Sequence, residues 1–380
     1  MERRLTSRNV SLDWIDKSDT NEGNWISALS IQNTYVRLKL QYELSLRQTW
    51  VEQLESPNQV LEQLSLAACL IELWRVMYGA IPAKEQAQPT TKPPFPGFVD
   101  IACGSGILVY VLHMEGYKGS GFDACRRKSW ETFPEDVQAC LEEKVIIPQP
   151  FMDVLGPREI GIEVHSGGFP ENTFIISDHA DELTVWTPIM AALASPSSPL
   201  PFFVIPCCSR SLAGSSYRYP LLESSAMQGG DQKTATNKTT GFVEQNPQPC
   251  SGDLRALRAA KMEEKTESGF LNSMIGSLAA KTMSIAGEVG YGVEKTWLRT
   301  PGAINMALIG GRDQATRDVP NSGGDSAKIE GFTAARLGRI MEVVERECLK
   351  DGGIHEAARL WIERARGLHL GNGIKHQASS

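Results

Sequence analysis

Two glycines, Gly104 and Gly106, lie between a short apolar run and a segment whose apolar residues recur at helical spacing. Glycine lets backbone N–H groups approach a ligand that any Cβ would keep at a distance. The apolar run at 98–102 predicts a buried parallel strand, and 107–114 predicts the following helix. Because a helix N-terminus attracts anionic groups, this junction indicates a nucleotide site.

Two carboxylates accompany these glycines. Asp100 lies near the carboxyl end of the first predicted strand, and Asp123 ends the next one, where it can bind ribose hydroxyls. Nicotinamide-dependent dehydrogenases use similar glycines, but Val109 replaces the third glycine of their fingerprint. The spacing therefore favours S-adenosylmethionine and resembles motif I of the class I methyltransferases. The expected cofactor contacts are Asp100, Cys103, Gly104, Ser105, Gly106, Asp123 and Asp178.

A second polar cluster follows the predicted strand at 173–176. Its candidates for a general base are His179, Asp181 and Glu182. A single Asp here can simply cap the next helix, but the cluster is too dense for capping alone. The same three side chains could bind a metal ion; we expect no metal, because no further ligand pattern accompanies them.

Cationic residues recur near both clusters. Residues 126–128 suit phosphate contacts, although a solvated helix start explains them equally well. Another predicted strand, 202–205, is followed by Cys207 and Cys208, whose side chains we expect to point apart, one packing and one lining the site. The expected substrate contacts are Arg126, Arg127, Lys128, Arg210 and Arg218.

Composition limits the protein class. The chain has 380 residues, of which 41% are hydrophobic, and a net charge of −7, which argues against non-specific coating of nucleic acid but allows a local basic face. It has no apolar run of about 18 residues, so we expect no membrane association. The start of the sequence lacks an apolar signal core, which favours a cytoplasmic or nuclear location, of which we expect the cytoplasm, and predicts reduced cysteines.

The predicted elements indicate an α/β chain. Amphipathic spacing predicts helices at 34–54 and 60–78, and 270–287 and 329–368 also read as helical. We further expect a short helix at 134–143, an edge strand at 145–147 and a hairpin of strands 292–298 and 303–309. The expected divisions are a loosely ordered N-terminus at 1–30, a helical cap at 31–80, a Pro-rich linker at 81–96, a methyltransferase domain at 97–311 with a disordered insertion at 221–253, a linker at 312–328, and a C-terminal helix and tail at 329–380.

Several stretches together resemble the eukaryotic tRNA (uracil-2'-O-)-methyltransferase family, which modifies uridine 44 of serine tRNA. They are 66–78, 99–130, 177–186, and 202–209 with 297–310. The resemblance implies a Rossmann-like class I fold with a mostly parallel seven-stranded sheet, S-adenosylmethionine as cofactor and serine tRNA as partner. The chain departs from the family pattern at Ala102, where glycine is common, and at Cys125, where a basic residue is frequent.

Two other functions remain open at this point. The fold does not fix the acceptor, so the chain can methylate another RNA or a protein. It can also be an inactive scaffold that binds the cofactor and RNA. The sequence identifies no protein partner.

Overall fold

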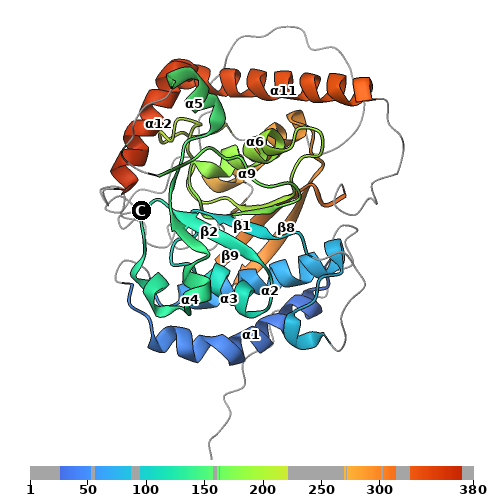
Figure 1. Ribbon diagram of the computed structural model, residues 1–380, viewed down its shortest axis with the longest axis vertical. Helices are drawn as coiled ribbons and strands as arrows, with labels where there is room; N and C mark the ends of the chain where they lie inside the picture. The colour runs from blue at the N-terminus through green and yellow to red at the C-terminus, as the bar shows by residue number, and fades with distance from the viewer. Residues whose placement is uncertain are drawn as a thin grey trace, which may run out of the picture.

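A seven-stranded sheet lies at the centre of the computed structural model, in the order β3-β2-β1-β6-β7-β9-β8 (Figure 1). Neighbours from β3 through β7 pair in parallel, and β9 is antiparallel to both β7 and β8. The predicted mostly parallel seven-stranded sheet is therefore confirmed. The strands are Leu141–Glu143 (β3), Gly119–Asp123 (β2), Phe98–Ile101 (β1), Phe174–Asp178 (β6), Phe202–Ile205 (β7), Ala303–Gly310 (β9) and Val293–Thr300 (β8).

The structure describes residues 26–52, 56–86, 95–156, 161, 163–220, 269–270, 272–300, 303–313 and 326–369. The insertion expected at 221–253 lies outside these residues. So do most of the expected N-terminal segment 1–30 and most of the expected linker at 312–328.

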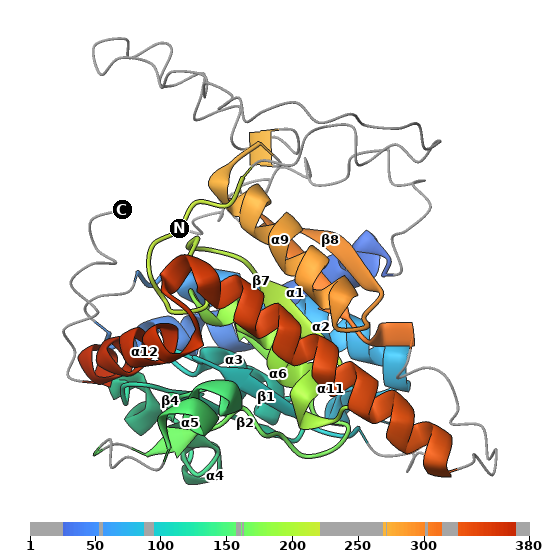
Figure 2. The ribbon, with the colours of Figure 1, turned by 90° about the horizontal axis from the view of Figure 1, so that it is seen from above.

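Successive residues of the central strands pack on opposite faces of the sheet. In β6, Ile175 belongs to one apolar core, whereas Phe174 and Ile176 belong to the other. Strands that are apolar on both faces need helices on both faces. One face carries α1 (Ala28–Gln48), α2 (Gln59–Tyr78) and α3 (Ile107–Met114); the other carries α6 (Leu183–Ala194), α9 (Met274–Glu288), α11 (Ser326–Cys348) and α12 (Ile354–His369) (Figures 1 and 2).

The first two helices are fixed to the sheet layer by polar contacts as well as by apolar packing. Glu115, which follows α3 and is fully buried, accepts hydrogen bonds from the Tyr42 hydroxyl and the Arg37 guanidinium, each at 2.7 Å. The Thr34 hydroxyl donates to Glu72 across the α1–α2 interface at 2.6 Å. Both predicted helices are confirmed, although α1 begins and ends about two turns earlier than predicted.

The edge strand of the sheet differs from the prediction. The segment expected to be one helix at 134–143 contains the short α4 (Glu135–Gln138) and then β3, which pairs with β2. The predicted edge strand at 145–147 is instead β4 (Val145–Ile146), which pairs with β5 (Val164–His165) in a separate two-stranded sheet. The polar sequence Leu-Glu-Glu of β3 carries no strand signal, which explains the error.

The C-terminal region divides where the sequence indicated continuous helix. Gly352 and Gly353 both have positive φ, 90° and 91°, and separate α11 from α12. This turn lets α12 pack against α5 (Gln149–Leu155) and β4, while α11 lies over α6 and α9 (Figure 2). The described residues also contain three short 3-10 helices, η1 (Ala83–Glu85), η2 (Lys128–Thr132) and η4 (Leu349–Asp351).

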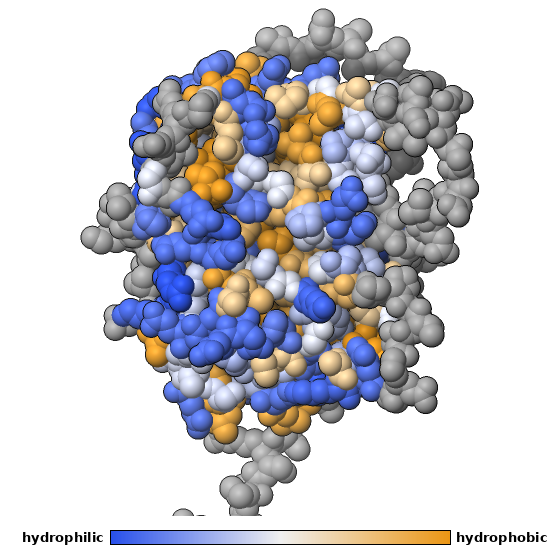
Figure 3. All heavy atoms as spheres, in the orientation of Figure 1, coloured by the Kyte–Doolittle hydropathy of each residue, from blue (hydrophilic) through white to orange (hydrophobic). Residues whose placement is uncertain are grey.

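The predicted hairpin is confirmed, with β8 and β9 in register from Val293–Gly310 to Thr300–Ala303. Among the described helices, none combines the length and apolar character needed to cross a bilayer. Hydrophilic and hydrophobic residues are interspersed over the face of the molecule seen in Figure 3.

Candidate active site

A cavity of about 480 Å³ lies at the carboxyl ends of the parallel strands. This volume is within the usual range for small-molecule sites, and the position is the usual one in open α/β sheets. Two sets of residues line the cavity from opposite loops. The glycine-loop wall consists of Asp100, residues 102–105 and Asp123; the acidic-loop wall consists of residues 178–182, Cys207, Cys208 and Arg364.

The glycine-loop wall is held by hydrogen bonds to its backbone. Gly104 and Gly106 adopt left-handed conformations, with φ of 51° and 73°. The Asp123 carboxylate accepts from the Gly104 N–H at 3.0 Å and from the Cys125 N–H at 3.1 Å. The Trp130 indole donates to the Gly104 carbonyl at 2.9 Å. The loop is therefore preorganised, while Asp123 keeps lone pairs for ribose hydroxyls.

Asp100 is the buried acceptor of this wall. Its side chain lines the cavity with 2% of its surface exposed, and its Oδ1 has no hydrogen-bond partner among the described residues. Burial raises the pKa of Asp100 well above its ordinary value, and the carboxylates of Asp178 and Asp123 add to this effect. An ammonium group in the cavity would satisfy Oδ1 and relieve the repulsion. This donor set fits S-adenosylmethionine.

The acidic-loop wall begins at an ion pair between Asp178, which is largely buried, and His179, whose side chain is 44% exposed. Asp178 Oδ1 lies 2.6 Å from His179 Nδ1, and Asp178 Oδ2 accepts from the Gln63 amide at 2.8 Å. Burial acts to raise the pKa of Asp178, but His179 and Gln63 outweigh it, and the pKa is lowered. Burial acts to lower the pKa of His179, but the Asp178 carboxylate outweighs it, and the pKa is raised.

The backbone of this loop is strained. His179 and Asp181 have φ of 52° and 45°, in the left-handed region that favours glycine. Each such residue costs of order 1 kcal/mol or more and persists only where its surroundings fix it. The loop is therefore held by its side-chain contacts.

Glu182 is fixed by the C-terminal helix. Both of its carboxylate oxygens accept from Arg364, each at 2.8 Å, and the residue is 6% exposed. The bidentate pair occupies both carboxylate oxygens and fixes the direction of the side chain. Its neighbour Asp181 accepts from the Cys207 thiol at 3.2 Å and lies 3.5 Å from both Arg210 and Arg364.

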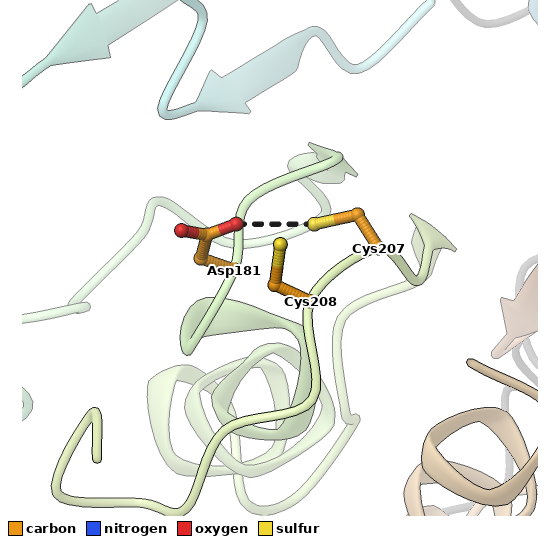
Figure 4. Close-up of side chains that lie close together, drawn as sticks. All are labelled: Asp181, Cys207 and Cys208. Carbon is orange, nitrogen blue, oxygen red and sulfur yellow. Dashed lines mark hydrogen bonds between the residues drawn. The ribbon is translucent and has the colours of Figure 1, made fainter. Parts of the chain in front are cut away.

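The two adjacent cysteines do not point apart as expected. The Sγ atoms of Cys207 and Cys208 and a carboxylate oxygen of Asp181 all lie within 4.8 Å of one another (Figure 4). β7 ends at Ile205, two residues before Cys207, so the cysteines are not in an extended strand, in which neighbouring side chains alternate. Both cysteines line the cavity.

Most of the predicted site residues meet at this cavity. Those that line it are Asp100, Cys103, Gly104, Ser105, Asp123, Arg127, Asp178, His179, Asp181 and Glu182. Gly106 lies behind the loop as the residue that precedes α3, with Trp130 and Leu141 3.1 Å from the position of a Cβ.

The remaining predicted residues lie at the periphery. Arg126 and Lys128 are exposed, and Arg126 stacks 5.8 Å from the Trp130 ring centroid. Arg127, between these two in the sequence, instead turns into the cavity, 3.8 Å from Asp123. Arg218 is exposed, and Arg210 lines a neighbouring open pocket that also contains Arg364.

Two helices contribute residues that the sequence analysis missed. From α2 come Gln59, Glu62, Gln63 and Leu66, and from α12 come Trp361, Arg364, Ala365 and Leu368. Each set recurs at helical spacing on one face. Polar residues grouped at the start of an otherwise apolar helix were the available signal for α2.

Known proteins similar to this chain point the same way as the geometry. A family model described as "Predicted AdoMet-dependent methyltransferase" matches residues 26–148, which include the glycine-loop wall. The cofactor of a family so described is S-adenosylmethionine, as the sequence predicted.

Curated relatives extend the similarity to the rest of the chain. The tRNA (uracil-O(2)-)-methyltransferase of Aspergillus oryzae is 48% identical over 379 residues, which cover 95% of this chain and 59% of that protein. Proteins of the same name from Neurospora crassa and Schizosaccharomyces pombe are 38% and 42% identical, over 83% and 73% of this chain and 53% and 46% of their own lengths. The chain thus spans about half the length of these relatives.

Proposed function

We propose, because this chain belongs to the tRNA (uracil-O(2)-)-methyltransferase family, that it transfers a methyl group from S-adenosylmethionine to the 2'-oxygen of a tRNA uridine. The finer assignment, uridine 44 of serine tRNA, rests on the sequence resemblance of 66–78, 99–130, 177–186, and 202–209 with 297–310. The cytoplasmic location and the domain boundaries inferred from the sequence stay proposals as well.

One observation carries this proposal: a single cavity joins a preorganised glycine loop to an acidic loop. The first supplies the contacts that the cofactor needs, namely Asp100 for an ammonium group and Asp123 for ribose hydroxyls. The second supplies polar side chains within the same cavity, where an acceptor hydroxyl can approach. Neither wall alone would distinguish a methyltransferase from another nucleotide-binding protein.

The bound cofactor supplies an activated methyl group on a sulfonium. The protein must therefore align the 2'-hydroxyl with that methyl and help remove its proton. We place the acceptor hydroxyl beside Asp181, which lines the cavity, and assign electrostatic control of the loop to the His179–Asp178 pair. Because Arg364 occupies both oxygens of Glu182, we assign Glu182 to positioning the loop rather than to accepting the proton.

The tRNA backbone would meet the rim of the cavity. Arg126 and Lys128 are exposed beside the glycine loop, and Arg210 and Arg218 lie beyond β7. We propose that these cations bind phosphates, which fixes the position of the strand without reading its sequence. Their removal should weaken tRNA binding and reduce its salt dependence.

Methylation of defined transcripts tests the function. Purified protein, serine tRNA and methyl-labelled S-adenosylmethionine should yield 2'-O-methyluridine after nuclease digestion, and a serine tRNA with cytidine at position 44 should yield none. A labelled base would contradict 2'-O transfer, and label in protein would favour the protein-acceptor alternative. Cofactor binding without any labelled product would favour the scaffold alternative.

A further inference from the structure

The cluster of Asp181, Cys207 and Cys208 is not needed for the cofactor contacts described above. It brings two thiols and one carboxylate together from two different loops, one after β6 and one after β7 (Figure 4). All three residues also line the cavity. These side-chain types are the ligands that zinc takes in proteins.

We infer that Asp181, Cys207 and Cys208 form a zinc site whose fourth coordination position opens into the cavity. The inference deepens the proposed function, on which its catalytic part rests. It departs from the expectation of no metal drawn from the sequence, where the cysteines and the acidic loop are separated by 25 residues.

The spacing of the ligand atoms suits such a site. Zinc–sulfur bonds of about 2.3 Å and tetrahedral angles place two sulfurs about 3.8 Å apart. The three ligand atoms lie within 4.8 Å of one another, and Cys207 Sγ is 3.2 Å from Asp181 Oδ1. Side-chain rotations that move atoms by about 1 Å or less would therefore complete the geometry.

The surrounding charges balance an anionic ligand set. Two thiolates and a carboxylate carry three negative charges, which exceed the charge of a divalent zinc ion by one. Arg210 and Arg364 lie 3.5 Å from the Asp181 carboxylate and offset this excess.

Three protein ligands and one open position are typical of catalytic zinc sites. The tRNA 2'-hydroxyl would take the open position, and the metal would lower its pKa as it does for bound water. The hydroxyl proton then passes to solvent, and the 2'-oxygen forms its bond to the methyl carbon. The methyl–sulfur bond breaks, sulfur keeps the electron pair, and the products are the 2'-O-methyl nucleotide and S-adenosylhomocysteine.

Metal binding is measured first, without reference to activity. The full chain is equilibrated with zinc, desalted and analysed for bound metal, and cobalt is titrated to detect the absorption of tetrahedral cobalt thiolate. We expect one zinc per chain in the wild type, and cobalt affinity reduced about tenfold or more in Cys207→Ser and Cys208→Ser. Cys140→Ser is the matched control, because Cys140 lies away from the cavity and should leave metal binding unchanged.

Binding of S-adenosylmethionine by the same variants shows that they fold. The double variant Cys207→Ala with Cys208→Ala repeats the metal-binding measurement without a polar side chain at either position. Zinc bound below stoichiometry, or bound equally by the double variant, overturns the inference. Full methylation by chelated wild type overturns the catalytic role of zinc but leaves the proposed function standing. Stoichiometric zinc without methylation of any tRNA would instead overturn the proposed function and leave the metal site standing.

Discussion

The two walls of the cavity are held together over very different sequence distances. In the glycine-loop wall, Asp123 and Trp130 bind the Gly104 backbone from 19 and 26 residues away. In the acidic-loop wall, Gln63 reaches Asp178 over 115 residues and Arg364 reaches Glu182 over 182. The first wall is thus one local strand-loop-helix unit, whereas the second exists only when α2, α12 and the sheet have assembled.

The largest effect is expected from a substitution that disrupts the glycine-loop wall alone. Gly104→Arg should abolish S-adenosylmethionine binding, because a long side chain would extend from a loop residue with φ of 51° that lines the cavity. Calorimetry checks this result. Gly156→Arg is the control, since Gly156 has φ of 67° but no atom within 4 Å of a Cβ position. Binding by Gly104→Arg at wild-type affinity would place the cofactor elsewhere.

A second change breaks the acidic-loop wall. Arg364→Ala removes both hydrogen bonds to the buried Glu182 and leaves it, among the described residues, only Arg210, at 3.8 Å, which should reduce the free energy of unfolding by about 3 kcal/mol. Chemical denaturation measures the loss, and adding Glu182→Gln should restore part of it. On the same helix, Arg359→Ala removes contacts to Glu356 and Glu363 at an exposed position and should change stability little. Equal losses from the two arginine variants would contradict this account.

The residues of the glycine-loop wall could be predicted from the sequence, whereas the residues that hold the acidic-loop wall could not. Asp100, Gly104 and Asp123 could be assigned because one strand, one turn and one helix place them together. Gln63 and Arg364 could not, because no local pattern relates them to the acidic loop that they hold. The cysteines were misjudged for a related reason: a turn after β7, rather than an extended strand, sets the directions of their side chains.

The secondary structure shows the same limit. The apolar strands β1, β6 and β7 could be predicted from their own residues, as could the hairpin of β8 and β9. The edge strand β3 could not, since its pairing with β2 rather than its composition makes it a strand. The break between α11 and α12 rests on two adjacent glycines that the helical spacing concealed.

The pH dependence of the acidic-loop wall gives a smaller effect. Because the pKa of His179 is raised in the folded protein, its ion pair contributes fully to the free energy of unfolding below pH 6.5, the ordinary pKa of histidine. This contribution is lost as the pH rises through the pKa of His179 in the folded protein. Because the pKa of Asp178 is lowered in the folded protein, its contribution to the free energy of unfolding is present above pH 3.8, the ordinary pKa of aspartate. It is lost as the pH falls through the pKa of Asp178 in the folded protein.

The stability difference between wild type and Asp178→Asn should therefore be largest between these two limits. Urea unfolding across pH measures this difference, and proton NMR follows the His179 titration directly. The His179 pKa should fall in Asp178→Asn. A His179 pKa at or below 6.5 in the wild type would show that the pair does not control the loop.

The smallest effect concerns strain in the glycine-loop wall. Ala102 has φ of 59°, which glycine adopts more readily, so Ala102→Gly should raise the free energy of unfolding by about 1 kcal/mol. Ala139→Gly, at a residue with φ of −65°, should lower it by about 0.5–1 kcal/mol. Thermal unfolding compares the two, and the same sign for both would exclude backbone strain at Ala102.

Single-turnover methylation of serine tRNA by Asp181→Asn tests most directly the claim that one wall holds the cofactor and the other acts on the acceptor. The reaction is measured beside calorimetry of S-adenosylmethionine binding, with Asp123→Asn as the matched change in the glycine-loop wall. Asp181→Asn should bind the cofactor as the wild type does and transfer methyl at least about 100-fold more slowly. Asp123→Asn should bind the cofactor about tenfold or more weakly. Methyl transfer by Asp181→Asn at the wild-type rate would contradict the claim.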